Sequence, residues 1–315
     1  MKKSVLIVGI ILLVIVCFAA IVMLSPKQKP EANINQLQKE EVSKVNEIPA
    51  PVFTKETYPK VDGATAMIPM GEEIAKKLLK MNDDEAKSVT KFNTTHPAYV
   101  NLIEKKADIV FAFGPSEDEV NLAKSKGSDL EIISIGRDGF IFMTNVENSV
   151  DNLSVKQIQD IYQSKIINWK EVGGSDAPII AYQRPENSGS QTSMERLVMK
   201  DLKMAVVPTE NVAVSMTDAI DRIATNAGAK NSIAYSFYYY AKAMYAKKEA
   251  RFMAVNGVLP DTQTIKDKTY PLTEDVCAVI RKDEPKDSGV RKMIEWLLSA
   301  EGQKVVERGG YVPIK

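Results

Sequence analysis

Apolar strand-like stretches and amphipathic helix-like stretches alternate from Tyr58 to the C-terminus, and this pattern constrains the fold more than any other feature. Residues 107–113 (ADIVFAF) have the continuous apolar character of a buried strand, and residues 130–135 and 139–145 are two further predicted strands. Residues 116–127 (SEDEVNLAKSKG) are a predicted helix with an acidic first turn and a terminal glycine. Strands separated by helices predict an α/β fold with mainly parallel sheets, and 315 residues suffice for two domains.

The N-terminus carries a separate signal. Two lysines precede an uninterrupted apolar run over residues 5–24, and about 20 such residues are needed for a helix to span a bilayer. The positive flank favours a cytoplasmic N-terminus, so the chain after this run is expected to be exported. Residues 1–24 are therefore predicted to be a membrane anchor or signal segment.

Three fates of this N-terminal segment remain open: an uncleaved membrane anchor, a lipoprotein modified at Cys17, and full secretion. All three place the globular part outside the cytoplasmic membrane. Residues 25–51 are polar, bounded by prolines and rich in lysine and glutamate, which is typical of a linker.

Composition excludes several classes of function. The chain has 41 basic and 41 acidic residues, without the basic excess of a nucleic-acid-binding protein. Two cysteines and one histidine at unrelated positions cannot form a zinc cluster, so no metal and no cofactor is expected. A catalytic pair of Cys277 and His96 is formally possible, but Cys277 stands in a strand-like run where a buried small residue is the simpler interpretation.

Three loops that follow predicted strands carry unusual residues, and ligands of open α/β sheets bind where such loops gather. In the first loop, Gly63 allows the backbone of Ala64 to approach a ligand closely, and Thr65 offers a hydroxyl. An ordinary turn between a strand and a helix explains the same residues.

In the second loop, residues 87–95 (KSVTKFNTT) are predicted to be a strand that ends in hydroxyl residues. Thr94, Thr95 and His96 precede Pro97, which fits the first turn of the next helix. Free backbone N–H groups and hydroxyls at such a position form an anion site, although simple helix capping is the alternative.

The third loop, residues 180–193 (IAYQRPENSGSQTS), points most strongly to an anion. The Arg184 guanidinium can direct two hydrogen bonds to one oxyanion, and Glu186 is placed to pair with it. Hydroxyls, an unobstructed backbone N–H and a helix start follow within seven residues. The binding residues predicted here are Arg184, Ser188, Gly189, Ser190 and Gln191. Neither the phosphate loop of nucleotide hydrolases nor the G-x-S-x-G nucleophile motif is present.

Four segments resemble the phosphate-binding proteins that deliver their ligand to ABC importers. They are residues 63–65 (GAT), 164–174 (SKIINWKEVGG), 184–192 (RPENSGSQT) and 296–314 (WLLSAEGQKVVERGGYVPI). The resemblance extends over roughly residues 58–315 and implies a two-lobed periplasmic-binding-protein-like (Venus flytrap) fold. It implies one lobe formed by residues 52–138 and 256–315, and a second lobe formed by residues 139–255.

The resemblance also implies a ligand and partners. A tetrahedral oxyanion, phosphate or a similar one, would lie between the lobes, and an ABC importer permease would receive it. The resemblance implies that Thr65, a hydroxyl from the second loop, Arg184, Ser188, Gly189 and Ser190 surround it. The full set of binding residues predicted from the three loops is Ala64, Thr65, Thr94, Thr95, His96, Arg184, Ser188, Gly189, Ser190 and Gln191.

The chain differs from the family pattern at three places. The second loop is not rich in glycine and serine, and Ala66 stands where an aromatic residue is expected. Residues 113–115 (FGP) occupy the place of an acidic residue that would accept the proton of hydrogen phosphate. Such an acceptor rejects sulfate, which has no proton to donate, so the sequence leaves the identity of the oxyanion open.

Three functions remain to be weighed. The membrane segment, the linker and the three loops together favour a tethered solute-binding protein at the cell membrane, with its globular part extracytoplasmic. A membrane-anchored anion sensor or accessory protein without a transport role is the alternative. An enzyme is disfavoured, because no metal set or activated nucleophile is evident.

Overall fold

The computed structural model describes residues 48–225 and 228–314. The predicted membrane anchor or signal segment, residues 1–24, and most of the linker at 25–51 lie outside these residues. Among the helices that are described, none is both long enough and apolar enough to cross a bilayer.

The described chain alternates strands and helices as the sequence predicts. The strands are β1 (Val61–Gly63), β2 (Ile109–Ala112), β3 (Leu130–Asn145), β4 (Asn152–Leu153), β5 (Ile180–Ala181), β6 (Ser232–Phe237), β7 (Ala250–Phe252), β8 (Ala254–Val255) and β9 (Thr273–Arg281). The α-helices are α3 (Ile68–Leu79), α4 (Asp83–Val89), α5 (Thr95–Ile103), α6 (Glu117–Ser125), α7 (Val155–Tyr162), α8 (Gly189–Ser193), α9 (Met216–Ala224), α10 (Thr262–Lys266), α11 (Gly289–Leu297) and α12 (Ala300–Arg308). The 3₁₀-helices are η1 (Thr65–Met67), η2 (Trp169–Val172), η4 (Thr209–Asn211) and η5 (Ala229–Asn231), and the π-helices are η3 (Met194–Met199) and η6 (Tyr240–Met244).

The larger sheet has the strand order β1-β2-β9-β3-β6-β5, with β7 also paired to β3, and β4 and β8 form a separate pair. Within the described residues, β1/β2, β5/β6 and β4/β8 are parallel. The pairs β2/β9, β3/β9, β3/β6 and β3/β7 are antiparallel. The prediction of mainly parallel sheets is therefore wrong. The reason is that the two longest strands, β3 and β9, run antiparallel to each other and to every other described strand with which they pair.

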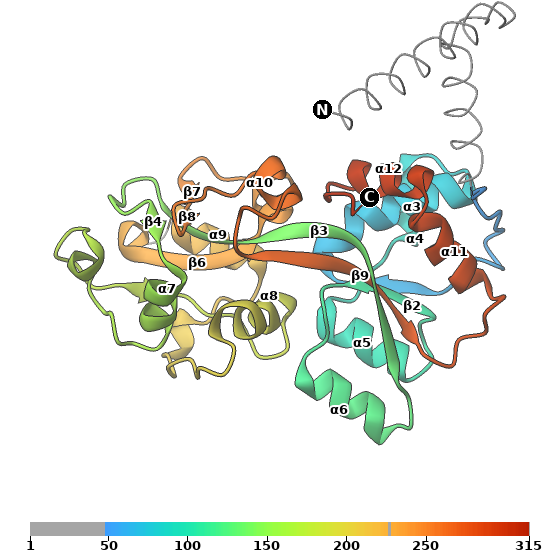
Figure 1. Ribbon diagram of the computed structural model, residues 1–315, viewed down its shortest axis with the longest axis horizontal. Helices are drawn as coiled ribbons and strands as arrows, with labels where there is room; N and C mark the ends of the chain where they lie inside the picture. Colours follow the sequence, from blue (N-terminus) through green and yellow to red (C-terminus); the bar gives the residue numbers. More distant parts are fainter. Residues whose placement is uncertain (1–47, 226–227, 315) are drawn as a thin grey trace, which may run out of the picture. The chain divides into compact units, whose positions relative to one another are not determined.

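Strands β3 and β9 link the two halves of the α/β fold, and Figure 1 shows them running side by side from one group of elements to the other. Residues Leu130–Gly139 of β3 pair with β9, and residues 140–144 pair with β6. The sequence suggested two strands here because Gly136, Asp138 and Gly139 interrupt the apolar pattern. The structure has one strand with a register shift between Ser134 and Gly136, since the irregularity is absorbed within the ladder.

Helix starts follow the local sequence closely. Ser116 caps α6 through a reciprocal capping box with Glu119, and three acidic residues fill the first turn, so this predicted helix is confirmed. Residues 87–95 do not form the predicted strand. Instead α4, which begins with a capping box between Asn82 and Glu85, extends to Val89, and residues 90–94 are irregular.

Asp138 lies where β3 passes from β9 to β6 and is 2% exposed. Its Oδ1 accepts hydrogen bonds from the backbone N–H of Gly139 at 2.8 Å and of Tyr239 at 3.3 Å. Burial raises the pKa of Asp138 to about 7, and these two hydrogen bonds offset only part of that effect. A neutral carboxylic acid is therefore favoured at this junction of the sheet below about pH 7.

This burial predicts a dependence of stability on pH. The folded-state pKa lies above the unfolded value, so the folded chain holds the proton more tightly. The contribution of Asp138 is fully present below about pH 4 and is lost as the pH rises to about 7. Asp138→Asn is expected to stabilise the chain by about 1–2 kcal/mol at about pH 8 and to flatten this decline. Denaturant unfolding of both proteins across that pH range measures the free energy of unfolding. An equally steep decline with pH in the variant would contradict the raised pKa assigned to Asp138.

Candidate functional site

A cavity of about 510 Å³ opens where loops from both halves of the fold meet. Its lining comprises residues 64–66, 94–96, 184–190 and 214–217, together with Phe237 and Tyr240. Nine of the ten residues predicted from the sequence line it: Ala64, Thr65, Thr94, Thr95, His96, Arg184, Ser188, Gly189 and Ser190. Three loops far apart in the sequence are thus brought to one cavity.

Arg184 is the cation of this cavity and is held from two sides. Its Nε donates to Ser190 Oγ at 3.1 Å, and its Nη1 donates to the carbonyl oxygen of Ala213. Burial lowers the pKa of Arg184, although an arginine remains charged at neutral pH. The expected pairing with Glu186 is wrong: Glu186 is exposed, and Arg184 forms no ion pair with a carboxylate in the described chain. Within the same residues Nη2 has no partner, which leaves donors for an anion.

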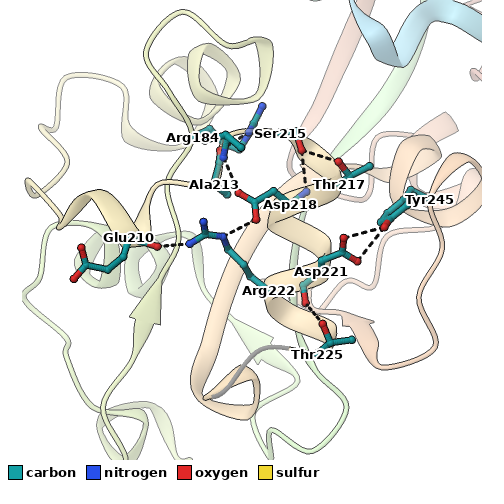
Figure 2. Close-up of polar contacts among 11 residues, drawn as sticks. Arg184, Glu210, Ala213, Ser215, Thr217, Asp218, Asp221, Arg222, Thr225 and Tyr245 are labelled. Carbon is teal, nitrogen blue, oxygen red and sulfur yellow. Dashed lines mark hydrogen bonds and ion pairs between the residues drawn. The ribbon is translucent and has the colours of Figure 1, made fainter.

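Asp218 fixes the turn that holds Arg184 (Figure 2). Its Oδ2 accepts from the backbone N–H of Val214 at 2.8 Å, and its Oδ1 accepts from Arg222 Nε at 2.8 Å. Burial raises the pKa of Asp218, but the hydrogen bonds from Arg222 and Val214 and the charges of Arg222 and Arg184 lower it on balance. Asp218 is therefore an anion that supports Arg184 from a distance without occupying its free donors.

Gln191 is the one predicted site residue that does not line the cavity. It is 5% exposed, and its Nε2 donates to Glu195 Oε1 at 2.8 Å. Its Oε1 accepts from the Tyr235 hydroxyl and, at 3.2 Å, from the backbone N–H of Arg184. The side-chain amide therefore holds the backbone of Arg184 in place and does not line the cavity.

The first two loops are tied together by Asp62, which is 4% exposed. Its Oδ1 accepts from the backbone N–H of Gly63 at 2.7 Å and of Asn93 at 2.8 Å. Its Oδ2 accepts from the side-chain amides of Asn93 at 2.9 Å and Asn101 at 2.8 Å. Sequence reasoning missed Asp62, and the only available signal was an acidic residue inside an otherwise apolar strand end.

Thr94 has a backbone conformation that is rare for a residue with a side chain, with φ 70° and ψ 170°. This region is nearly exclusive to glycine, and strain of this kind gathers at functional sites. Thr94 immediately precedes α5, whose first backbone N–H groups have no partner inside the helix. The strained residue thus directs the chain into a helix start at the cavity wall.

The strain at Thr94 predicts the effect of a substitution. Thr94→Gly is expected to raise the free energy of unfolding by about 1 kcal/mol, because relief of strain exceeds the entropy gained by the unfolded chain. Denaturant unfolding of both proteins measures the difference. A variant of lower stability would show that the threonine side chain contributes more than its conformation costs.

His96 is the third unusual residue of the second loop. Its Nδ1 lies 3.1 Å from Glu119 Oε1, and its side chain is 42% exposed. No contact joins it to Cys277 in the described chain. Cys277 is buried in β9, and burial raises the pKa of its thiol to about 12, so no reactive thiolate forms there near neutral pH.

Residues 214–217 contribute to the cavity and were not predicted. They form the start of α9, where Ser215 Oγ accepts from the backbone N–H of Asp218 at 3.0 Å. The sequence of this segment carries no Gly-rich or charged signal that links it to the other three loops. Only the fold places it opposite Arg184.

Within residues 48–225 and 228–314, no group of histidine, cysteine and acidic side chains is arranged to hold a metal ion. What the cavity does offer is donors: one arginine with unused N–H groups, hydroxyls from several loops and the first turns of two helices. This arrangement is suited to binding an oxyanion reversibly.

The family model of the PBP superfamily domain matches residues 54–301, which is more than half of the chain. The chain therefore belongs to the PBP superfamily, whose two-domain α/β fold agrees with the architecture described above.

The chain is also similar in sequence to individual proteins. The chain is 28% identical over 182 residues to the phosphate-binding protein PstS of Borreliella burgdorferi, covering 56% of this chain and 64% of that protein. It is 28% identical over 265 residues to PstS of Staphylococcus aureus, covering 80% of this chain and 77% of that protein. The chain thus spans slightly less than two thirds of the Borreliella protein.

Solved structures agree in fold. A candidate phosphate ABC transporter substrate-binding protein from Clostridium perfringens, with bound phosphate, matches at TM-score 0.62 and 25% identity, covering 81% of this chain and 98% of that chain. An ABC-type phosphate transport receptor from Vibrio cholerae matches at TM-score 0.60 and 22% identity, covering 81% and 99% of the two chains.

Proposed function

We propose that this chain is an extracytoplasmic solute-binding protein that captures phosphate, or a similar tetrahedral oxyanion, for an ABC importer. The observation that carries the proposal is Arg184, a partly buried cation with free donors in a cavity lined by hydroxyls. The relatives named as phosphate-binding proteins, and the Clostridium perfringens structure with bound phosphate, support the choice of phosphate.

The proposed ligand residues act through distinct groups. Arg184 supplies charge-assisted hydrogen bonds, which are about twice as strong as neutral ones. Thr65, Thr95, Ser188 and Ser190 supply hydroxyls, each of which donates one hydrogen bond. Backbone N–H groups of Gly189 and of the α5 first turn complete a set of neutral donors. Such a site binds an anion without surrounding it with full positive charge.

Closure of two lobes over the anion is part of the proposal. We assign one lobe to residues 52–138 and 256–315 and the other to residues 139–255, so that β3 and β9 cross between them. Asn187 Nδ2 donates to Asp118 Oδ2 at 3.0 Å, and these two residues come from different proposed lobes. Contacts of this kind stabilise a closed state in which water is excluded and each hydrogen bond to the anion strengthens.

The N-terminal segment is proposed to determine where the protein is located. A membrane anchor over residues 1–24, or a lipid on Cys17, would keep the binding domain near a permease after export. The proposed role is binding and delivery, not catalysis.

Uptake of labelled phosphate tests the importer role. Cells that lack this chain are expected to take up phosphate more slowly at low external concentration, and the intact chain is expected to restore the rate. Arg184→Ala should fail to restore it. Unchanged uptake in cells without the chain, with phosphate binding intact in the purified protein, would favour the membrane-anchored sensor instead.

A further inference from the structure

His96, which is partly exposed, pairs with the buried Glu119 at the cavity wall, and the anion donors do not explain the role of this pair. His96 lines the cavity, while Glu119 is 1% exposed. Both oxygens of Glu119 are engaged: Oε2 accepts from the backbone N–H of Ser116 at 2.8 Å, and Oε1 lies 3.1 Å from His96 Nδ1. When Glu119 is ionised, its carboxylate only accepts, so Nδ1 of the imidazole carries the proton of this contact.

This contact determines what the other ring nitrogen offers. When Nδ1 of a neutral imidazole carries the proton, Nε2 presents a lone pair. In the described chain Nε2 of His96 has no protein partner. Within the described residues, His96 thus adds an unoccupied acceptor to a cavity whose other lining groups include the Arg184 guanidinium and several hydroxyls.

We propose that His96 Nε2 accepts the proton of hydrogen phosphate, and that Glu119 positions His96 for this by holding its Nδ1 proton. The inference rests on the proposed function and deepens it. Inorganic phosphate carries at least one O–H at neutral pH, whereas sulfate carries none. A sulfate oxygen facing Nε2 would leave two acceptors opposed and unpaired, which costs binding free energy. His96 thus selects phosphate over sulfate.

The surroundings of the pair agree with this role. Burial raises the pKa of Glu119, while the hydrogen bonds from Ser116 and His96 lower it in part. The other carboxylates of the same helix turn are directed elsewhere: Asp118 accepts from Asn187, and Glu117 is exposed without a partner in the described chain. Glu119 is therefore the group that decides which nitrogen of His96 is protonated.

Titration calorimetry with inorganic phosphate and with sulfate, at about pH 8, tests the inference on the purified full chain and its variants. His96→Gln places an amide that can donate to sulfate, so the ratio of the two affinities is expected to fall at least about 10-fold. Glu119→Gln keeps the capping box but can donate to Nδ1, which moves the imidazole proton to Nε2. The same fall in the ratio is expected, without any change in the atoms that line the cavity.

Glu117→Gln is the matched control, because it removes a carboxylate from the same turn without touching His96. The ratio of phosphate to sulfate affinity in this variant should equal that of the wild type. If the ratio of phosphate to sulfate affinity is unchanged in both His96→Gln and Glu119→Gln while phosphate still binds, the role of His96 is overturned. The proposed function would not be affected by that result. A larger effect in Glu117→Gln would also overturn the role of His96. A wild-type chain that binds neither anion would overturn the proposed function and this inference together.

Discussion

Arg184→Ala is expected to weaken phosphate binding by at least about 100-fold, or roughly 3 kcal/mol. Arg184 is the only arginine or lysine that lines the cavity in the described chain. Its removal deletes charge-assisted hydrogen bonds to the anion and also frees Ser190 Oγ and the Ala213 carbonyl from their present donor. Calorimetric titration of wild type and variant with phosphate measures the loss.

Arg308→Ala is the matched control for this experiment. Arg308 pairs with Glu73 at 3.0 Å, has a side chain that is 53% exposed and does not line the cavity. Exposed pairs contribute about 0–1 kcal/mol to stability, so phosphate affinity should stay the same. Retained affinity in Arg184→Ala would contradict the assignment of the site, provided that the variant unfolds at the same denaturant concentration as the wild type.

Gly189→Ala is expected to weaken binding by about 10- to 100-fold. A Cβ atom on Gly189 would lie 2.6 Å from Thr95 Oγ1, closer than real Cβ contacts allow. Thr95 is 8% exposed and starts α5, so it has little room to move. The added methyl group would push apart two loops that we propose to bind the same anion.

Two further variants isolate this effect. Gly289 follows the capping residue Ser288 at the start of α11, as Gly189 follows Ser188, but it lies outside the cavity. Gly289→Ala should therefore leave phosphate affinity unchanged. Thr95→Ala in combination with Gly189→Ala should cost less than the two single losses added together, because the clash is removed. Strict additivity would show that Gly189 acts through something other than contact with Thr95.

The loops were predictable because their signals are local. Arg184 and the Ser188–Ser190 run stand within seven residues, and a threonine-rich helix start marks the second loop. The α/β class followed equally from the alternation of strand and helix patterns. Nine of the ten predicted residues share one cavity because loops after strands gather at sheet ends.

Other features depend on contacts between distant segments and left no local signal. The strand β3 appeared as two strands because glycines and Asp138 interrupt its pattern, whereas pairing with β9 carries it through. Asp62 acts through Asn93 and Asn101, which are far away in sequence, and the turn at 214–217 joins the other loops at the cavity only in the folded chain. The expected pair of Arg184 and Glu186 is wrong, because the guanidinium donates to the nearby Ser190 and to the Ala213 carbonyl, and only the fold places Ala213 beside it.

The central claim is that this cavity binds phosphate through Arg184. The most direct test is calorimetric titration of the purified full chain with inorganic phosphate and then with sulfate at neutral pH. The account predicts saturable binding of phosphate at one site per chain, with sulfate much weaker. No heat of binding with phosphate, from a chain shown to be folded, would contradict it and would mean that the fold serves another ligand.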